Sequence, residues 1–164
     1  MGSQNIGGTR RPRTAAWALL ALLVGASGLL AATSHGAAPA QDPLNDAFAR
    51  VCSNCHDPGR ITQSRRTRVE WEDVIYQMID RGAAGSDQDY SLVLQYLLRD
   101  FGRVNVNQAA AEELALVLGL TSKEADAIVA YRKANGGFKD FEGLLKVPDL
   151  DPEKLASRRP AVLF

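Results

Sequence analysis

The sequence is poor in the side chains that bind metal ions. Its 164 residues include only two cysteines, two histidines and two methionines. The cysteines are Cys52 and Cys55, and His56 is the only histidine beyond the first forty residues. Because a structural zinc site needs about four ligands, these residues are too few to form one. The sequence also has no Ser/His/Asp set and no spare histidine for acid–base chemistry, so it favours a non-enzymatic role.

Signals for β-strands are scarce as well, whereas apolar residues at helical spacing are common, so we predict an all-α fold. Capping-box spacing at Ser86 and Asp89, and again at Thr121 and Glu124, predicts two helix starts. The helix pattern changes near Gly102, which predicts two small domains, residues 41–102 and residues 103–164.

Neither predicted domain is strongly basic. Residues 41–102 hold seven arginines and ten acidic residues, a balance of −3, and residues 103–164 hold nine basic and nine acidic residues, a balance of zero. A nucleic-acid binder usually has a clear positive balance. The charge pattern therefore does not favour DNA as a partner.

Residues 1–40 have the layout of a signal peptide. Arginines at positions 10, 11 and 13 precede an apolar run over residues 15–32, and small residues follow at 36–40. The run is also long enough to span a bilayer, so an uncleaved inner-membrane anchor is the alternative. In either case we expect export. The protein is then periplasmic, or anchored to the inner membrane facing the periplasm, with membrane contact only through this segment.

The most specific motif is the stretch Cys52-Ser53-Asn54-Cys55-His56. Two cysteines three positions apart, followed directly by histidine, form the attachment pattern of c-type haem, in which the histidine ligates the iron. We therefore predict one covalent haem c, and export supports it because bacteria attach this haem outside the cytoplasm. The alternative is a disulfide or redox-active dithiol, but such pairs follow a strand and none is expected upstream.

A second iron ligand is predicted from the few candidates that remain. Four residues have the spacing of one helix face: Trp71, Val74, Ile75 and Met78. Met78 is the only methionine apart from Met1, so we predict His56 and Met78 as the axial ligands. Methionine ligation raises the reduction potential and suits electron transfer. The alternative is a five-coordinate haem, with Met78 packed in the core.

An arginine-rich loop lies between the attachment motif and this helix. Its Arg65 and Arg66 are candidate partners of the haem propionates, because a guanidinium group pairs well with a carboxylate. A solvated loop without haem contacts is the alternative.

Residues 44–102 resemble the short monohaem class I c-type cytochromes. The resemblance lies in the attachment motif at 52–56, Trp71, Met78, Gly82-Ala83 and Tyr96-Leu97. In that family the first and last helices cross beside the haem, which implies that Phe48 lies near Tyr96 and Leu97. The resemblance also implies a redox protein partner, such as a dehydrogenase, a terminal oxidase or another cytochrome.

Residues 103–160 resemble the ComEA-type helix-hairpin-helix domain of competence DNA receptors. The matching residues include the stretches 104–109, 118–120, 131–132, 136–138 and 144–147. The resemblance implies two pairs of helices. Each pair is joined by a turn that reads glycine, apolar residue, glycine, and the backbone N–H groups of the turn hold a DNA phosphate.

Both expected turns depart from that pattern. The first is Gly119-Leu120-Thr121, with Lys123 close by, and the second is Asp149-Leu150-Asp151. Two carboxylates repel a phosphate, so we expect no DNA contact at the second turn. Gly119, Thr121 and Lys123 are candidates for a phosphate site at the first turn, with a purely structural turn as the alternative.

Two functions follow from these patterns. The favoured one is an exported c-type cytochrome that carries single electrons and docks to a redox partner through its helix-hairpin-helix domain. The alternative is a DNA-binding protein of an uptake or competence-like system, in which the haem is structural or senses the redox state.

Overall fold

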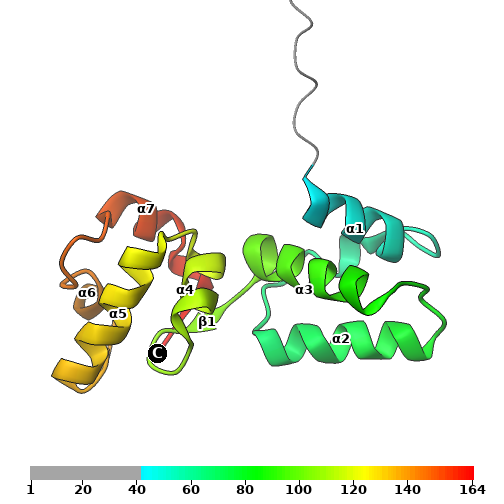
Figure 1. Ribbon diagram of the computed structural model, residues 1–164. Coiled ribbons are helices and arrows are strands. Elements are labelled where there is room, and N and C mark those ends of the chain that lie inside the picture. Colours follow the sequence, from blue (N-terminus) through cyan, green and yellow to red (C-terminus); the bar gives the residue numbers. More distant parts are fainter. Residues whose placement is uncertain (1–41) are drawn as a thin grey trace, which may run out of the picture. The chain divides into compact units, whose positions relative to one another are not determined.

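Residues 42–164 are described by the computed structural model, so the predicted leader lies outside the described residues. Within this range the chain forms seven α-helices, two 3-10 turns and one pair of very short strands (Figure 1). The all-α prediction is confirmed. No helix within residues 42–164 has the length and apolar character needed to span a bilayer.

Three helices form the first group: α1 (Pro43–Cys52), α2 (Arg68–Asp80) and α3 (Asp87–Phe101), with the short turn η1 (Pro58–Arg60) after α1. Helix α1 begins because Asp42 accepts a 3.1 Å hydrogen bond from the Leu44 N–H. Both α1 and α2 pack against α3. The Phe48 ring stacks on Tyr96 with 4.4 Å between centroids, a contact that the resemblance to short cytochromes implies.

The second group begins with strand β1 (Val104–Asn105) and helices α4 (Ala111–Leu118) and α5 (Ser122–Asn135). Three short elements follow, α6 (Phe141–Leu144), α7 (Pro152–Ser157) and η2 (Arg159–Ala161), before strand β2 (Val162–Leu163). Strand β2 lies parallel to β1, with Val104 paired to Val162 and Asn105 paired to Leu163. The core between these elements includes the fully buried side chains of Leu114, Leu118, Ile128, Leu144 and Leu155.

The backbone around residue 102 connects the two groups. The Arg66 N–H donates to Phe101 O at 3.0 Å, and the Arg103 N–H donates to Arg66 O at 2.7 Å. A further contact joins α2 to α4, where Arg68 Nε lies 3.1 Å from Glu113 Oε2. Residues 42–164 belong to a single compact unit. The boundary between residues 102 and 103 stays a prediction.

Candidate functional site

The first hairpin turn connects α4 to α5. Gly119 has a φ of 66°, a left-handed conformation that costs least for glycine. Its N–H caps the end of α4 by donating to Ala115 O. The buried side chain of Leu120 anchors the turn. The glycine cap and the buried leucine therefore hold the turn in one conformation. Helix α5 begins directly after the turn, at Ser122.

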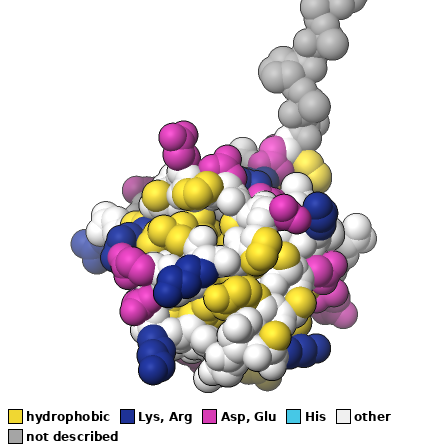
Figure 2. All heavy atoms as spheres, turned by 90° about the vertical axis from the view of Figure 1, so that its left-hand side faces the viewer, with side chains coloured by type: hydrophobic (Ala, Val, Ile, Leu, Met, Phe, Trp, Pro, Cys, Tyr) yellow, Lys and Arg dark blue, Asp and Glu magenta, His cyan; other side chains and the backbone are white. Residues whose placement is uncertain are grey.

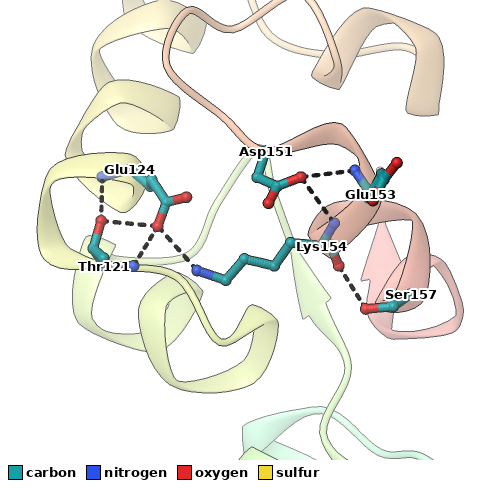
Figure 3. Close-up of polar contacts among 6 residues, drawn as sticks. All are labelled: Thr121, Glu124, Asp151, Glu153, Lys154 and Ser157. Carbon is teal, nitrogen blue, oxygen red and sulfur yellow. Dashed lines mark hydrogen bonds and ion pairs between the residues drawn. The ribbon is translucent and has the colours of Figure 1, made fainter.

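Thr121 and Glu124 form the predicted capping box at the start of α5 (Figure 3). The Thr121 N–H and hydroxyl donate to Glu124 Oε2 at 2.6 and 2.8 Å, and the Glu124 N–H donates to Thr121 Oγ1 at 3.3 Å. The Thr121 N–H is the main cause that lowers the pKa of Glu124. A negative charge is therefore held beside the first candidate phosphate site.

Helix α7, which follows the second turn, contacts the start of α5 (Figure 3). Asp151 caps α7 by accepting hydrogen bonds from the N–H groups of Glu153 and Lys154 at 2.9 and 3.2 Å. The side chain of Lys154 then extends to Glu124, with 3.2 Å between Nζ and Oε2. This ion pair fixes α7 against the capping box, and it occupies a lysine that a DNA phosphate would otherwise attract.

A second ion pair lies between the two turns themselves. Lys123 Nζ is 3.3 Å from Asp149 Oδ2, and the two side chains are 82% and 66% exposed. Exposed pairs of this kind contribute little to stability, so a phosphate can displace Asp149 at low cost. The structure thus brings Gly119, Thr121 and Lys123 together at one turn, but it places a carboxylate from the second turn against the lysine. Sequence reasoning did not find this contact, because the two residues are far apart in the chain.

The residues of the haem prediction meet at one apolar pocket in the first helix group. Cys52, Cys55, His56 and Met78 all line it, and the space enclosed is about 840 Å³ including the open mouth. The other lining residues are mostly aliphatic or aromatic side chains from all three helices. The structure therefore brings together four residues that the sequence separates by as many as 26 positions.

Two features bear on the chemistry of this pocket. Burial raises the pKa of the Cys52 thiol to about 11, so this thiol is protonated at neutral pH and is a poor nucleophile for disulfide exchange. His56 Nδ1 lies 3.1 Å from the carbonyl oxygen of Asp57. Since a carbonyl only accepts, this hydrogen bond requires the proton on Nδ1, and in the neutral ring that tautomer leaves the Nε2 lone pair for a ligand.

Arg65 and Arg66 do not line the pocket. Arg65 NH1 donates to the carbonyl oxygens of Asp100 and Gly102 at 3.1 and 3.4 Å. The Arg66 guanidinium lies 5.3 Å from the centroid of the Trp71 ring. The pocket lining instead includes Arg81, which sequence reasoning missed. The sequence signal that could have identified Arg81 is its position, three residues after Met78 at the end of the same helix.

Comparison with known proteins identifies the second helix group. Residues 100–162 match a family model described as helix-hairpin-helix motif, and this supports the predicted ComEA-type domain. An uncharacterized protein of Haemophilus influenzae is 36% identical over 63 residues, which are 38% of this chain and 56% of that protein. ComE operon protein 1 of Bacillus subtilis is 46% identical over 44 residues, 27% of this chain and 22% of that protein.

A third relative is endonuclease/exonuclease/phosphatase family domain-containing protein 1 of Xenopus laevis, which is 38% identical over 60 residues, 37% of this chain and 11% of that protein. The chain thus spans little more than half of the first of these relatives and much less of the other two. No solved structure matches the chain with significance.

These findings correct the order of the two predicted functions. The sequence patterns predicted a cytochrome that binds a metal and transfers electrons, with DNA binding as a minor role. That characterisation was wrong, because the matched helix-hairpin-helix model favours DNA binding and begins at residue 100, outside the attachment motif. Within residues 42–164, moreover, no group of three or more His, Cys, Asp or Glu side chains is placed to hold a metal ion.

Proposed function

We propose that this chain is a DNA-binding protein that contacts DNA through its helix-hairpin-helix domain. The observation that carries the proposal is the family match over residues 100–162, which includes both turns. At the first turn, Gly119 lets the backbone approach a ligand closely. The start of α5 follows at once, and the dipole of a helix favours an anion at this end.

The charges near the turns set the expected strength of this binding. Asp149 and Asp151 make the second turn unfavourable for phosphate, so the first turn carries the contact. With few phosphates neutralised, binding is weak, independent of DNA sequence and strongly weakened by salt. We expect dissociation constants near the weak end of the range for non-specific binding, about 10⁻⁴ M at physiological salt.

The test is fluorescence anisotropy of a labelled DNA duplex with the full chain, at low and then at physiological salt. Binding is expected at low salt. Lys123→Glu should weaken it and reduce the slope of log affinity against log salt by about one. Arg60→Glu makes the same charge change in the first helix group and serves as the matched control. No binding at low salt, or an equal loss in both variants, contradicts the proposal.

We further propose that the apolar pocket holds one covalently attached haem c, which in a DNA-binding protein is structural or senses the redox state. Cys52 and Cys55 would bond to the porphyrin, and His56 and Met78 would ligate the iron. The group fits these residues because all four line one pocket that is otherwise mainly apolar. Arg81, in the same lining, supplies a cation suited to a propionate. When bound, the haem would supply one-electron redox chemistry.

Covalent attachment is tested by haem staining of the protein after denaturing electrophoresis, following expression with a c-type haem maturation system. The wild-type chain should retain the stain, and Cys52→Ser with Cys55→Ser should lose it. Met78→Ala should keep the stain but change the spectrum of the ferric haem, because only the iron ligand is removed. An unstained wild-type chain rules out the cofactor.

This attachment chemistry agrees with export, so we also propose that the protein works in the periplasm or faces it from an inner-membrane anchor. The proposal rests on the layout of residues 1–40. Cell fractionation of the full chain tests it, and recovery in the cytoplasm contradicts it.

A further inference from the structure

A hollow lies at the C-terminal end of α5, apart from both hairpin turns. It is formed by the end of α5, the following turn over residues 136–140 and the start of α6, and it encloses about 560 Å³ including its open mouth. Its lining includes an aromatic pair, Tyr131 and Phe138, two lysines, Lys139 and Lys146, and one carboxylate, that of Asp140.

The wall of this hollow is held in one shape. Asn107, which follows β1, accepts a 2.7 Å hydrogen bond from the Phe138 N–H and donates one of 2.8 Å to Phe138 O. Gly137 has a φ of 95°, and a Cβ built on it would lie 2.9 Å from Asn107 Oδ1. Only glycine therefore fits there. A wall fixed in this way loses little conformational freedom when a ligand binds.

The aromatic pair gives the hollow a flat surface. The rings of Tyr131 and Phe138 are parallel within 7°, with 5.6 Å between their centroids. Phe138 is buried, at 5% exposure, whereas Tyr131 remains partly exposed. Tyr131 is thus supported from beneath by a buried ring. A nucleic-acid base stacks on such an aromatic surface irrespective of its identity.

The lining of the hollow includes two lysines whose charges no ion pair occupies. Lys123 and Lys154 are paired with Asp149 and Glu124. Among the residues that the structure describes, neither Lys139 nor Lys146 has a carboxylate within ion-pair distance. Figure 2 shows Lys and Arg side chains placed singly among hydrophobic ones, without a continuous basic patch. Lys139 and Lys146 can therefore attract a phosphate to the hollow, although the domain as a whole is neutral.

We infer that this hollow binds one unpaired nucleotide of DNA, with its base against Tyr131 and its phosphate between Lys139 and Lys146. The inference rests on the proposed DNA binding and adds single-stranded DNA as a ligand. A base inside a duplex is stacked on both sides and is not free to lie on a tyrosine. Helix α5 has 14 residues, so the hollow lies about 20 Å from the first turn, and the two sites are separable by mutation.

The experiment measures binding of labelled oligothymidine and of a labelled blunt duplex to the full chain by fluorescence anisotropy at low salt. Two variants test the hollow: Tyr131→Leu, which keeps an apolar side chain but removes the ring, and Lys139→Glu combined with Lys146→Glu. Each should lower the affinity for oligothymidine by at least about fivefold and leave duplex affinity nearly unchanged. Lys123→Glu should do the reverse.

Lys133→Glu is the matched control, because it reverses a charge on α5 outside the lining of the hollow. An equal loss of oligothymidine binding in this variant overturns the inference, as does unchanged binding in both variants of the hollow. Competition by free thymidine monophosphate as strong as by oligothymidine also overturns it, since the ligand would then be a free nucleotide. Oligothymidine binding that depends on the hollow, without any duplex binding, supports the inference and refutes only the proposed contact at the first turn.

Circular dichroism of Tyr131→Leu distinguishes a lost contact from a lost fold. The double lysine variant changes only exposed side chains and provides the same test without that concern. If it alone retains full oligothymidine affinity, the phosphate contact is refuted.

Discussion

Asp149 is, among residues 42–164, the one residue other than glycine with a positive φ, at 66°. A left-handed conformation costs an ordinary L-residue about 1–2 kcal/mol, although aspartate tolerates it better than most. The residue also places its carboxylate against Lys123. A single side chain thus strains the second turn and reduces the positive charge at the first.

Replacing Asp149 should therefore improve DNA binding. Asp149→Asn removes the charge and keeps a side chain that tolerates this φ, and Asp149→Gly removes both the charge and the strain. Both should raise duplex affinity at low salt, because Lys123 becomes available to a phosphate. Thermal unfolding should show Asp149→Gly to be as stable as the wild type or more stable, by up to about 1 kcal/mol. Unchanged affinity in both variants shows that Lys123 does not contact DNA.

At the scale of single elements, helix starts were the features most readily predicted from sequence. The capping boxes at Ser86 and at Thr121 are both present, with the expected partners three residues later. They were predictable because a cap depends on residues within one turn of helix. The pairing of β1 with β2 was not predicted. Each strand has only two residues, which is too short to produce a periodic pattern of apolar residues.

The residues of the candidate sites also fall into two classes, those that local sequence predicted and those that tertiary packing positions. The pocket residues were predicted from a motif and from a shortage of alternatives, and the structure brings them together. The positions of Arg65 and Arg66 depend instead on carbonyl groups exposed at the end of α3 and on the Trp71 ring. Those partners are set by tertiary packing, so sequence spacing alone did not indicate them.

The capping residues at the start of α3 predict that the stability of the fold depends on pH. Asp89 accepts hydrogen bonds from the Ser86 N–H and hydroxyl at 3.0 and 2.8 Å and pairs with Arg50 of α1. The Ser86 N–H, followed by Arg50 and the Ser86 hydroxyl, lowers the pKa of Asp89 from 3.8 to about 2. The folded state therefore holds this proton less tightly than the unfolded state, and the resulting stability, present above about pH 4, is lost as the pH falls toward 2.

This effect is measured by urea unfolding between neutral pH and pH 2. Asp89→Asn cannot be charged, so its stability should fall less steeply over that range than that of the wild type. Asp87→Asn makes the same change two positions earlier in the same helix and serves as the control. Equal pH slopes for the wild type and Asp89→Asn contradict the assigned role.

At the scale of the whole molecule, Gly102 lies where the two helix groups join. A Cβ built on this residue would lie 2.1 Å from the carbonyl oxygen of Leu98, a distance that no relaxation of a side chain can relieve. The same short segment carries the backbone bonds between Arg66, Phe101 and Arg103. Any side chain at position 102 must therefore displace the backbone that joins the groups.

Gly102→Ala should destabilise the chain by about 2 kcal/mol or more, because overpacking against backbone forces the joined segments apart. Tryptophan fluorescence, to which the buried Trp71 of the first group contributes, and far-ultraviolet circular dichroism of the whole chain should both show the lower melting temperature. Gly136→Ala is the comparison, since its φ of 80° gives strain but no atom lies within 4 Å of its Cβ. A loss in Gly102→Ala no larger than in Gly136→Ala contradicts the steric argument.

The parallel pair of β1 and β2 also constrains the order in which the chain folds. Helices α1 and α2 both pack against α3, and all three end before residue 102, whereas Val104 finds its strand partner only at Val162. A chain that emerges from its amino end can therefore complete the pocket before synthesis reaches residue 162, but the helix-hairpin-helix domain must wait for that segment. The proposed haem pocket and the proposed DNA-binding surface are then completed one after the other in the life of each molecule.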